Sequence, residues 1–371
     1  MLHRLILLAA ACLLGACGQP EPWRQESYVF GTRVELAIAG VPEARARTAA
    51  DKVLRDFDVL HRTYHAWQPS ELSALNEAIA AGRSHEVSAE FAAYLREAQA
   101  VAAAGDHLFD PGIGRLVALW GFHSDDIRPQ LPDGPALKAL IAAKPSIAAL
   151  TIREGSCHAP HRGEPQSPPS AGRGTGGWCI RSRVNSVAID FGGYLKGVAL
   201  DRATALLRAD GIADALVNIG GNVMALGTRD GAGTPWRIGI QHPRPQAVGG
   251  APLATLELRD GEAIGTSGDY HRYFEVAGRR YCHLLDPRSG FPADGTQAVT
   301  VLIAPGAQAG MRSDALSKPI FIAGADWRAM AGRVGVTAVL RVGADGTASA
   351  TPAMQARLKI DLPDLKLAVV P

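Results

Sequence analysis

The chain has 371 residues, and its 38 Lys and Arg against 36 Asp and Glu give a formal net charge of +2 at pH 7. With 47% hydrophobic residues, a chain of this length can bury a sizeable core in one large domain or in two packed ones. No basic run stands out in the sequence, which argues against a nucleic acid as partner, because binding to a phosphate backbone requires a concentrated basic surface.

The first residues have the layout of an export signal. Arg4 precedes an apolar run, Leu5 to Leu14, that is too short to span a bilayer. The run ends in Leu14-Gly15-Ala16-Cys17, which resembles a bacterial lipobox. We expect residues 1–16 to be removed as a signal peptide and Cys17 to be lipidated, so that residues 17–27 link the folded domain to a membrane on its periplasmic side. The alternative is an ordinary secreted protein that is cleaved nearby.

The first half of the chain predicts mostly helices. Ser88 is a suitable N-cap for a helix that ends at Gly105, and another helix begins at Pro69 or Ser70. The turn at Phe109-Asp110-Pro111-Gly112 opens a further amphipathic helix. The other elements expected here are strands over 28–38 and 150–153 and helices over 44–64, 88–104 and 135–143.

Residues 155–178 form a Pro-, Gly- and Ser-rich stretch that cannot bury enough apolar surface to fold by itself, so we expect a flexible insertion. Cys157 and Cys179 flank it and could pair in an oxidising compartment. Closing a loop of this size would contribute roughly 3 kcal/mol of stability. Cys282 is expected to be a buried small residue rather than a nucleophile, because nothing near it marks a cysteine-based mechanism.

After the insertion the pattern becomes mainly extended. Ala277-Gly278 is typical of a tight hairpin turn. Strands are expected over 187–191, 215–219, 236–240, 254–258, 273–276, 280–284, 298–303, 338–342 and from 348 onwards, with helices over 198–209, 317–323 and 325–331.

The stretch from Ile264 to Gly290 is typical of an active-site wall. Gly265-Thr266-Ser267-Gly268 is predicted to be a small-residue turn whose N–H groups and hydroxyls can approach a phosphate. His283 follows, three residues before Asp286-Pro287-Arg288-Ser289-Gly290. A proton acceptor, a carboxylate and a guanidinium thus fall within one loop-sized segment.

Two further glycine-rich segments each follow a predicted strand. Asp190-Phe191-Gly192-Gly193-Tyr194-Leu195-Lys196-Gly197 leads into a helix, where N–H groups, the helix dipole and an ammonium can hold a phosphate, although a plain tight turn explains it equally well. Asn218-Ile219-Gly220-Gly221 is either a strand-terminating turn or a close approach to a ligand.

Taken in order, these motifs closely resemble the ApbE family of FAD:protein FMN transferases over about Tyr28 to Gly346. The resemblance implies an α+β, T-fold-like architecture of mixed and antiparallel sheets packed with helices, in two intimately associated subdomains over 28–371. The matching segments are Phe30-Gly31-Thr32, residues 69–76, Phe109-Asp110-Pro111, Asp190 to Gly193 with Lys196-Gly197, Asn218 to Gly221, Thr266 to Tyr270, His283 with Asp286 to Gly290, and Asp314 to Ser317.

The family reaction implied by this resemblance cleaves FAD at its pyrophosphate, esterifies FMN to a Thr or Ser hydroxyl of an acceptor flavoprotein and releases AMP. The acceptor is expected to be a subunit of a membrane redox complex. The resemblance assigns His283 as the base, and Asp314 and the main-chain carbonyl of Leu195 as magnesium ligands. Asp286 and Arg288 would orient His283 or pair with each other. The FAD-binding set comprises Asp110, Asp190, Lys196, Gly220, Gly221, Thr266, Ser267, Gly268 and Asp269, with Tyr64 or Trp67 as the stacking aromatic.

The sequence departs from the family at Lys318-Pro319. Family members commonly have a threonine of the metal site in place of Lys318, and an ammonium cannot ligate a cation. Pro319 is expected to be the first helical residue of this segment. Lys318 would then either turn away and leave a weaker metal site or partly replace the metal. Two other functions stay open: an FAD-binding or delivery lipoprotein whose metal site was lost through Lys318, and an FAD pyrophosphatase in which water replaces the acceptor hydroxyl.

Overall fold

The computed structural model describes residues 21–157, 177–244, 252–362 and 365–371. The expected signal peptide, Cys17 and most of the insertion over 155–178 lie outside these residues. No helix of the described segments is long and apolar enough to cross a membrane.

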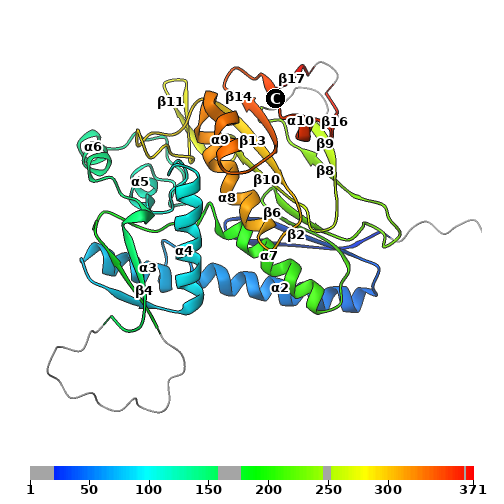
Figure 1. Cartoon of the computed structure of the whole chain (residues 1–371), viewed down its shortest axis with the longest axis horizontal. Helices are drawn as coiled ribbons and strands as arrows, with labels where there is room; N and C mark the ends of the chain where they lie inside the picture. Colours follow the sequence, from blue (N-terminus) through cyan, green and yellow to red (C-terminus); the bar gives the residue numbers. More distant parts are fainter. Residues whose placement is uncertain (1–20, 158–176, 245–251, 363–364) are drawn as a thin grey trace, which may run out of the picture.

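A nine-stranded sheet forms the centre of the molecule (Figure 1). Its neighbours are antiparallel except for the last pair, which is parallel. In spatial order the strands are β1 (Trp23–Val29), β2 (Thr32–Ala39), β6 (Asp214–Ile219), β7 (Asn222–Leu226), β10 (Ala263–Gly268), β13 (Thr296–Ile303), β14 (Ala338–Gly343), β15 (Ala348–Ala350) and β17 (Leu367–Val369).

The first hairpin differs from the single strand predicted over 28–38. Phe30 and Gly31 have φ angles of 58° and 68° and form the turn between β1 and β2. A positive φ is rare for an aromatic residue, so the sequence pattern does not reveal the turn. β1 starts at Trp23, within the predicted anchor linker, and the folded domain therefore begins earlier than residue 28.

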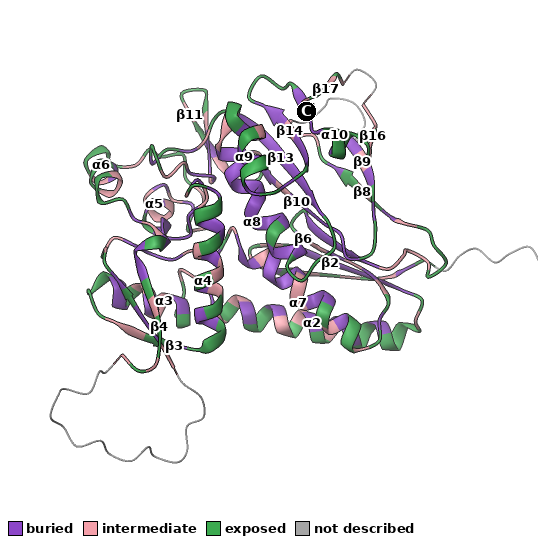
Figure 2. Ribbon diagram, in the orientation of Figure 1, coloured by how far each residue is buried: buried purple, intermediate pink, exposed green. Residues whose placement is uncertain are grey.

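Three helices cover one face of this sheet: α2 (Glu43–Thr63), α7 (Leu195–Ala209) and α8 (Ala309–Ile322) (Figure 1). Helix α8 packs against β10 and β13 and is buried along almost its whole length (Figure 2). Strand alternation separates two cores. In β13, Val299 and Val301 join the helix-side core, whereas Ala298 and Leu302 join the core on the opposite face.

A small antiparallel sheet covers the opposite face of the large one. It contains β8 (Trp236–Ile240), β9 (Ala254–Leu258) and β16 (Leu358–Ile360), with the short helix α10 (Pro352–Gln355) beside it. The bounds predicted for β8 and β9 are confirmed.

The remaining elements form a helical lobe beside the sheet (Figure 1). The hairpin of β11 (Tyr273–Val276) and β12 (Arg279–Cys282) stacks Phe274 and Tyr281 on Trp120 of this lobe. The lobe contains α3 (Glu71–Ala80), α4 (Ala89–Ala104), α5 (Gly114–Leu119), α6 (Gly134–Ala143), and a sheet of β3 (His85–Val87), β5 (Trp178–Ser182) and β4 (Leu150–Glu154), while α9 (Trp327–Arg333) follows α8.

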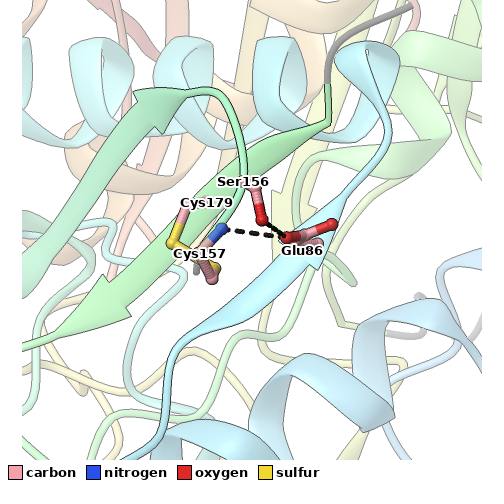
Figure 3. Close-up of a disulfide and its surroundings, with 4 residues drawn as sticks. All are labelled: Glu86, Ser156, Cys157 and Cys179. Atoms are coloured by element: carbon pink, nitrogen blue, oxygen red, sulfur yellow. Dashed lines mark hydrogen bonds between the residues drawn. A yellow bond between two sulfur atoms is a disulfide. The ribbon is translucent and has the colours of Figure 1, made fainter. Parts of the chain in front are cut away.

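Cys157 and Cys179 form a disulfide, so the suggested pairing is confirmed (Figure 3). Glu86 of β3 accepts hydrogen bonds from the Ser156 hydroxyl and the Cys157 N–H at the same point. The two ends of the insertion are thereby tied to the small sheet of the lobe.

Two predicted elements were wrong. Residues 187–191 form no strand and pair only through the isolated bridge between Ala188 and Ile113. Helix α8 begins at Ala309 and continues through Pro319, which was expected to start it. A helix tolerates an internal proline when packing compensates for the lost N–H bond. Pro319 lies against Gly105, where an added Cβ would approach the proline Cβ to 3.0 Å.

Candidate active site

Helix α8 brings two predicted site residues together. Because α8 is continuous through Pro319, Asp314 and Lys318 are separated by one helical turn and lie on the same face. Their side chains are 1% and 9% exposed, and the Lys318 Nζ lies 2.6 Å from Asp314 Oδ1. Charged side chains are almost never buried unless they are paired, so each of these residues requires the other.

The Asp314 carboxylate is surrounded by donors. Besides Lys318, the Gly197 N–H donates to Oδ2 at 3.0 Å and the Asn222 amide donates to Oδ1 at 3.3 Å. The Lys196 Nζ lies 3.7 Å from Oδ1. Burial alone would raise the pKa of this carboxyl, but the two ammonium groups and the donors hold its pKa below the ordinary value. Asp314 is therefore ionised.

The Lys318 side chain is held in this position by its surroundings. Its Nζ also donates to the Asp314 carbonyl at 2.7 Å. Its stem passes Gly193, where an added Cβ would lie 2.6 Å from the lysine Cε and 2.8 Å from a ring atom of Phe109. The Phe109 ring centroid is 5.8 Å from Nζ. The alternative in which Lys318 turns away is therefore wrong.

These donors do not fit a magnesium ion. Mg²⁺ takes about six oxygen ligands at about 2.1 Å in octahedral geometry. Of the two residues assigned to it, Asp314 and Leu195, Asp314 has its Oδ1 occupied by the Lys318 ammonium, which cannot act as a ligand. Within the described residues, no group of three or more His, Cys, Asp or Glu side chains could hold a metal ion.

His283 follows β12 and is partly buried. Its Nδ1 lies 3.2 Å from the Arg272 carbonyl, which can only accept a hydrogen bond, so Nδ1 carries the proton and Nε2 keeps a lone pair. Burial lowers the pKa of His283, and the charges of Arg272, Lys196 and Lys318 add to the effect, bringing it to about 3. His283 thus shares one site, with a positive potential, with Asp314, Lys196 and Lys318.

Arg272 and Asn222 were not predicted as site residues. The Arg272 guanidinium is fixed by the Phe122 carbonyl at 2.9 Å and the Asp125 carboxylate at 2.8 Å. Asn222 begins β7 and is 2% exposed beneath Asp314. A lone arginine just before a hairpin carries no sequence signal. Asn222 closes the glycine-rich motif over 218–222, and its polar side chain was the signal that could have assigned it to the site.

The segment predicted as a phosphate-binding turn is strand β10, in the middle of the large sheet. Gly265 provides space for helix α8 rather than for a ligand, since a Cβ there would lie 2.1 Å from the Ser313 carbonyl oxygen. Alternation places neighbouring side chains on opposite faces. Ser267 meets Ser317 of α8 at 2.8 Å, whereas Thr266 lines a cavity of about 270 Å³ beside β8.

The Gly220-Gly221 turn joins β6 to β7 and lines the same cavity as Thr266. Both glycines have positive φ angles, 58° and 90°, which only glycine adopts readily. Around Gly221 nothing lies within 4 Å of an added Cβ, so this turn has open space on one side.

Three carboxylates of the predicted FAD-binding set already have protein partners. Asp269 forms a two-bond fork with Arg244, at 2.6 and 2.7 Å. Asp190 accepts the Gly192 N–H at 2.7 Å, and burial raises its pKa. Asp110 accepts four bonds, from the N–H groups of Gly112 and Ile147, the Ser146 hydroxyl and the His107 ring. These bonds shape loops, and a contact with FAD stays a prediction for all three.

The two candidate stacking aromatics differ in exposure. Tyr64 is 4% exposed, and its ring packs against Phe91 and Tyr94 inside the core. Trp67 is partly exposed and lies in edge contact with His123. Trp67 is therefore the residue of the two that can offer a ring to a ligand.

Asp286 and Arg288 pair with each other. The Arg288 Nη2 donates to Asp286 Oδ2 at 2.8 Å, and its Nε donates to Oδ1 at 3.0 Å. Of the two alternatives for Asp286 and Arg288, mutual pairing is the one that the structure shows, while the His283 ring nitrogen contacts the Arg272 carbonyl. Cys282 is buried, and burial raises its pKa to about 12, in agreement with a non-nucleophilic role.

Comparisons of the sequence with known proteins agree on one family. The model of the ApbE family matches residues 30–340. The FAD:protein FMN transferase of Rhodobacter capsulatus is 40% identical over 342 residues, which cover 92% of this chain and 59% of that protein. The FAD:protein FMN transferase of Escherichia coli K12 is 27% identical over 333 residues, 86% of each chain.

Solved structures give the same result for the fold. The ApbE protein of Thermotoga maritima superposes with a TM-score of 0.75 at 27% identity, over 91% of this chain and 99% of that one. The apo form of the flavinyl transferase ApbE of Pseudomonas stutzeri gives a TM-score of 0.71 at 25% identity, over 92% and 98%. The predicted α+β fold is thereby confirmed.

Proposed function

The chain belongs to the ApbE family of flavin transferases, and on that premise we propose that it transfers FMN from FAD to a Thr or Ser hydroxyl of an acceptor flavoprotein and releases AMP. The observation that carries this proposal is the neutral His283 imidazole beside a cluster of cations. Phosphoryl transfer requires positioned charge around the phosphates and a group that takes one proton.

In the proposed step, the acceptor hydroxyl oxygen forms a bond to the phosphorus of the FMN half. The bond from that phosphorus to the bridging oxygen breaks, and AMP leaves with the electron pair. The hydroxyl proton passes to Nε2 of His283, which is free to accept it because Nδ1 is bonded to the Arg272 carbonyl. Atoms and charge balance without any other reactant.

The cations of the site support the same step. Burial is the main cause of the lowered pKa of His283, and the positive potential of Arg272, Lys196 and Lys318 lowers it further. The pyrophosphate of FAD would offset this potential, so the pKa of His283 would rise when FAD binds and the imidazole would become a stronger base. Binding and proton transfer are therefore coupled through charge.

We also propose that Cys17 carries a lipid anchor that holds the domain at the periplasmic face of a membrane, near an acceptor subunit of a redox complex. The lipobox-like Leu14-Gly15-Ala16-Cys17 supports this proposal. Metabolic labelling with a clickable fatty acid should label the wild-type protein, whereas Cys17→Ser should not be labelled. Equal labelling of both would refute the anchor.

Intact-protein mass spectrometry tests the transfer. The protein, FAD, Mg²⁺ and a candidate acceptor should give an acceptor whose mass increases by FMN less water, with AMP in the supernatant. Free FMN and AMP without an adduct would indicate a pyrophosphatase instead. Intact FAD with every acceptor tried would refute the enzymatic function and favour a binding or delivery role.

His283→Ala tests the role of the histidine in the same assay. Loss of a general base typically costs about 10²- to 10⁴-fold in rate, so transfer should fall by that amount while FAD binding persists. His85→Ala is a matched control, because His85 lies in strand β3 of the small sheet of the lobe. Unchanged transfer in His283→Ala would contradict the assignment.

A further inference from the structure

We propose that the Lys318 ammonium is the resident cation of this site, and that the chain binds the pyrophosphate of FAD through it without a divalent metal ion. The inference rests on the proposed function, because FAD is taken as the ligand. It concerns the one position where this chain departs from the magnesium set that its resemblance implied.

The first support is the position of the ammonium. Lys318 Nζ lies 2.6 Å from Asp314 Oδ1 and 2.7 Å from the Asp314 carbonyl, so it contacts the same carboxylate that was expected to bind magnesium. The Lys196 Nζ is 3.7 Å from the same oxygen. A divalent cation would have to displace one ammonium and remain beside the other, and both would repel it.

The second support is that the chain builds a slot for the lysine. Gly193 leaves room for the stem, since any Cβ there would lie 2.6 Å from Lys318 Cε. The Phe109 ring lies beside the head group, and the one-turn spacing on α8 fixes the head group above Asp314. The lysine stem therefore passes through the space that Gly193 leaves between the two segments.

The third support is donor capacity. An ammonium has three N–H groups, and Lys318 uses two of them on Asp314. Among the residues that the structure describes, no partner is found for the third. Lys196 likewise donates one hydrogen bond to the Gly192 carbonyl, at 2.8 Å. Together the two lysines can donate hydrogen bonds to phosphate oxygens and offset their negative charge. A metal ion would otherwise supply that positive charge.

Two measurements that need no acceptor test this proposal. The first follows Mn²⁺, as a paramagnetic probe for Mg²⁺, by electron paramagnetic resonance with the full chain. Wild-type protein should show no stoichiometric Mn²⁺ binding, whereas Lys318→Thr should bind one ion, because a hydroxyl replaces the ammonium. Lys359→Thr, on the exposed side of β16, is the matched control and should behave as wild type.

The second measurement titrates FAD by flavin fluorescence in EDTA and in Mg²⁺. The wild-type affinity should be equal in both, within about twofold, whereas Lys318→Thr should bind about tenfold or more weakly in EDTA and recover in Mg²⁺. Lys318→Met keeps the shape of the stem and should lose affinity in both media, which keeps the test valid if the threonine variant unfolds.

One tightly bound Mn²⁺ per wild-type chain, or an FAD affinity that falls in EDTA, would overturn the proposal. A failure of the proposed function would be seen in a different assay, as missing transfer of FMN to the acceptor. The Mn²⁺ and FAD titrations require no transfer.

Discussion

Asp110 and Asp314 are both carboxylates whose side chains are 1% exposed, and the sequence assigned both to the active site. They are satisfied in opposite ways. Asp110 accepts two backbone N–H groups, a hydroxyl and a histidine ring, and it holds the 110–112 loop against residues 146–147. Asp314 accepts one backbone N–H, from Gly197, but its other partners are two lysines and an amide.

The difference separates structure from function. Neutral donors fixed in the backbone cannot be transferred to a ligand, so the bonds to Asp110 stabilise its loop. Ammonium groups on long stems keep unused donors and can share them with an anion, so the Asp314 cluster can serve a ligand. Burial of a carboxylate is therefore a poor guide to function until its partners are known.

Asp314→Asn is expected to cause the largest loss of folding stability. The substitution leaves the buried Lys318 ammonium without its counter-charge, and breaking one side of a buried pair costs about 3–5 kcal/mol. Urea unfolding followed by circular dichroism measures the loss. The double variant Asp314→Asn with Lys318→Met should recover most of the stability, and a double variant as unstable as Asp314→Asn would contradict the pairing.

A smaller effect is expected for Asp110→Ala. The substitution removes the acceptor of neutral donors and leaves no unpaired buried charge, so the loss should be about 2 kcal/mol in total and unfolding should occur at lower urea concentration. FAD affinity, measured by flavin fluorescence on the folded protein, should stay within about twofold because the loop only supports the site. A loss of FAD affinity larger than the loss of stability would show that Asp110 itself contacts the ligand.

The smallest effect concerns pH. The pKa of His283 in the folded protein, about 3, lies below its ordinary value of 6.5. As pH falls below 6.5, His283 is protonated in the unfolded chain but stays neutral in the folded one. The free energy of unfolding therefore decreases as the pH falls toward 3. The contribution should be about 1–2 kcal/mol between pH 6.5 and pH 5.

Urea unfolding of wild type and His283→Gln at these two pH values isolates that contribution. The glutamine variant should lose less stability on acidification. An identical pH dependence in both proteins would contradict the lowered pKa of His283.

The sequence predicted the elements that local chemistry determines. Alternation placed β8, β9 and β11, and Ser88 caps α4 by accepting the Phe91 N–H as expected. It failed where packing overrides local preference. Pro319 lies inside α8, and Gly265 of β10 makes room for that helix rather than forming a turn.

The residues of the site were predicted better than their arrangement, because the arrangement depends on packing. His283, Lys196, Asp314 and Lys318 were identified and do lie together. The orientation of Lys318 depends on the helix that Pro319 seemed to forbid, so it could not be settled from the pattern. The Arg272 guanidinium is held by the backbone carbonyls of Phe122 and Ser124, which are distant in sequence. No sequence motif indicates such contacts.

The most direct test of the metal-free account is the initial rate of FMN transfer to an acceptor, measured by intact mass in EDTA and again with excess Mg²⁺. The account predicts equal rates within about twofold, because the Lys318 ammonium already supplies the charge. A rate that falls about tenfold or more in EDTA and returns with Mg²⁺ would contradict it.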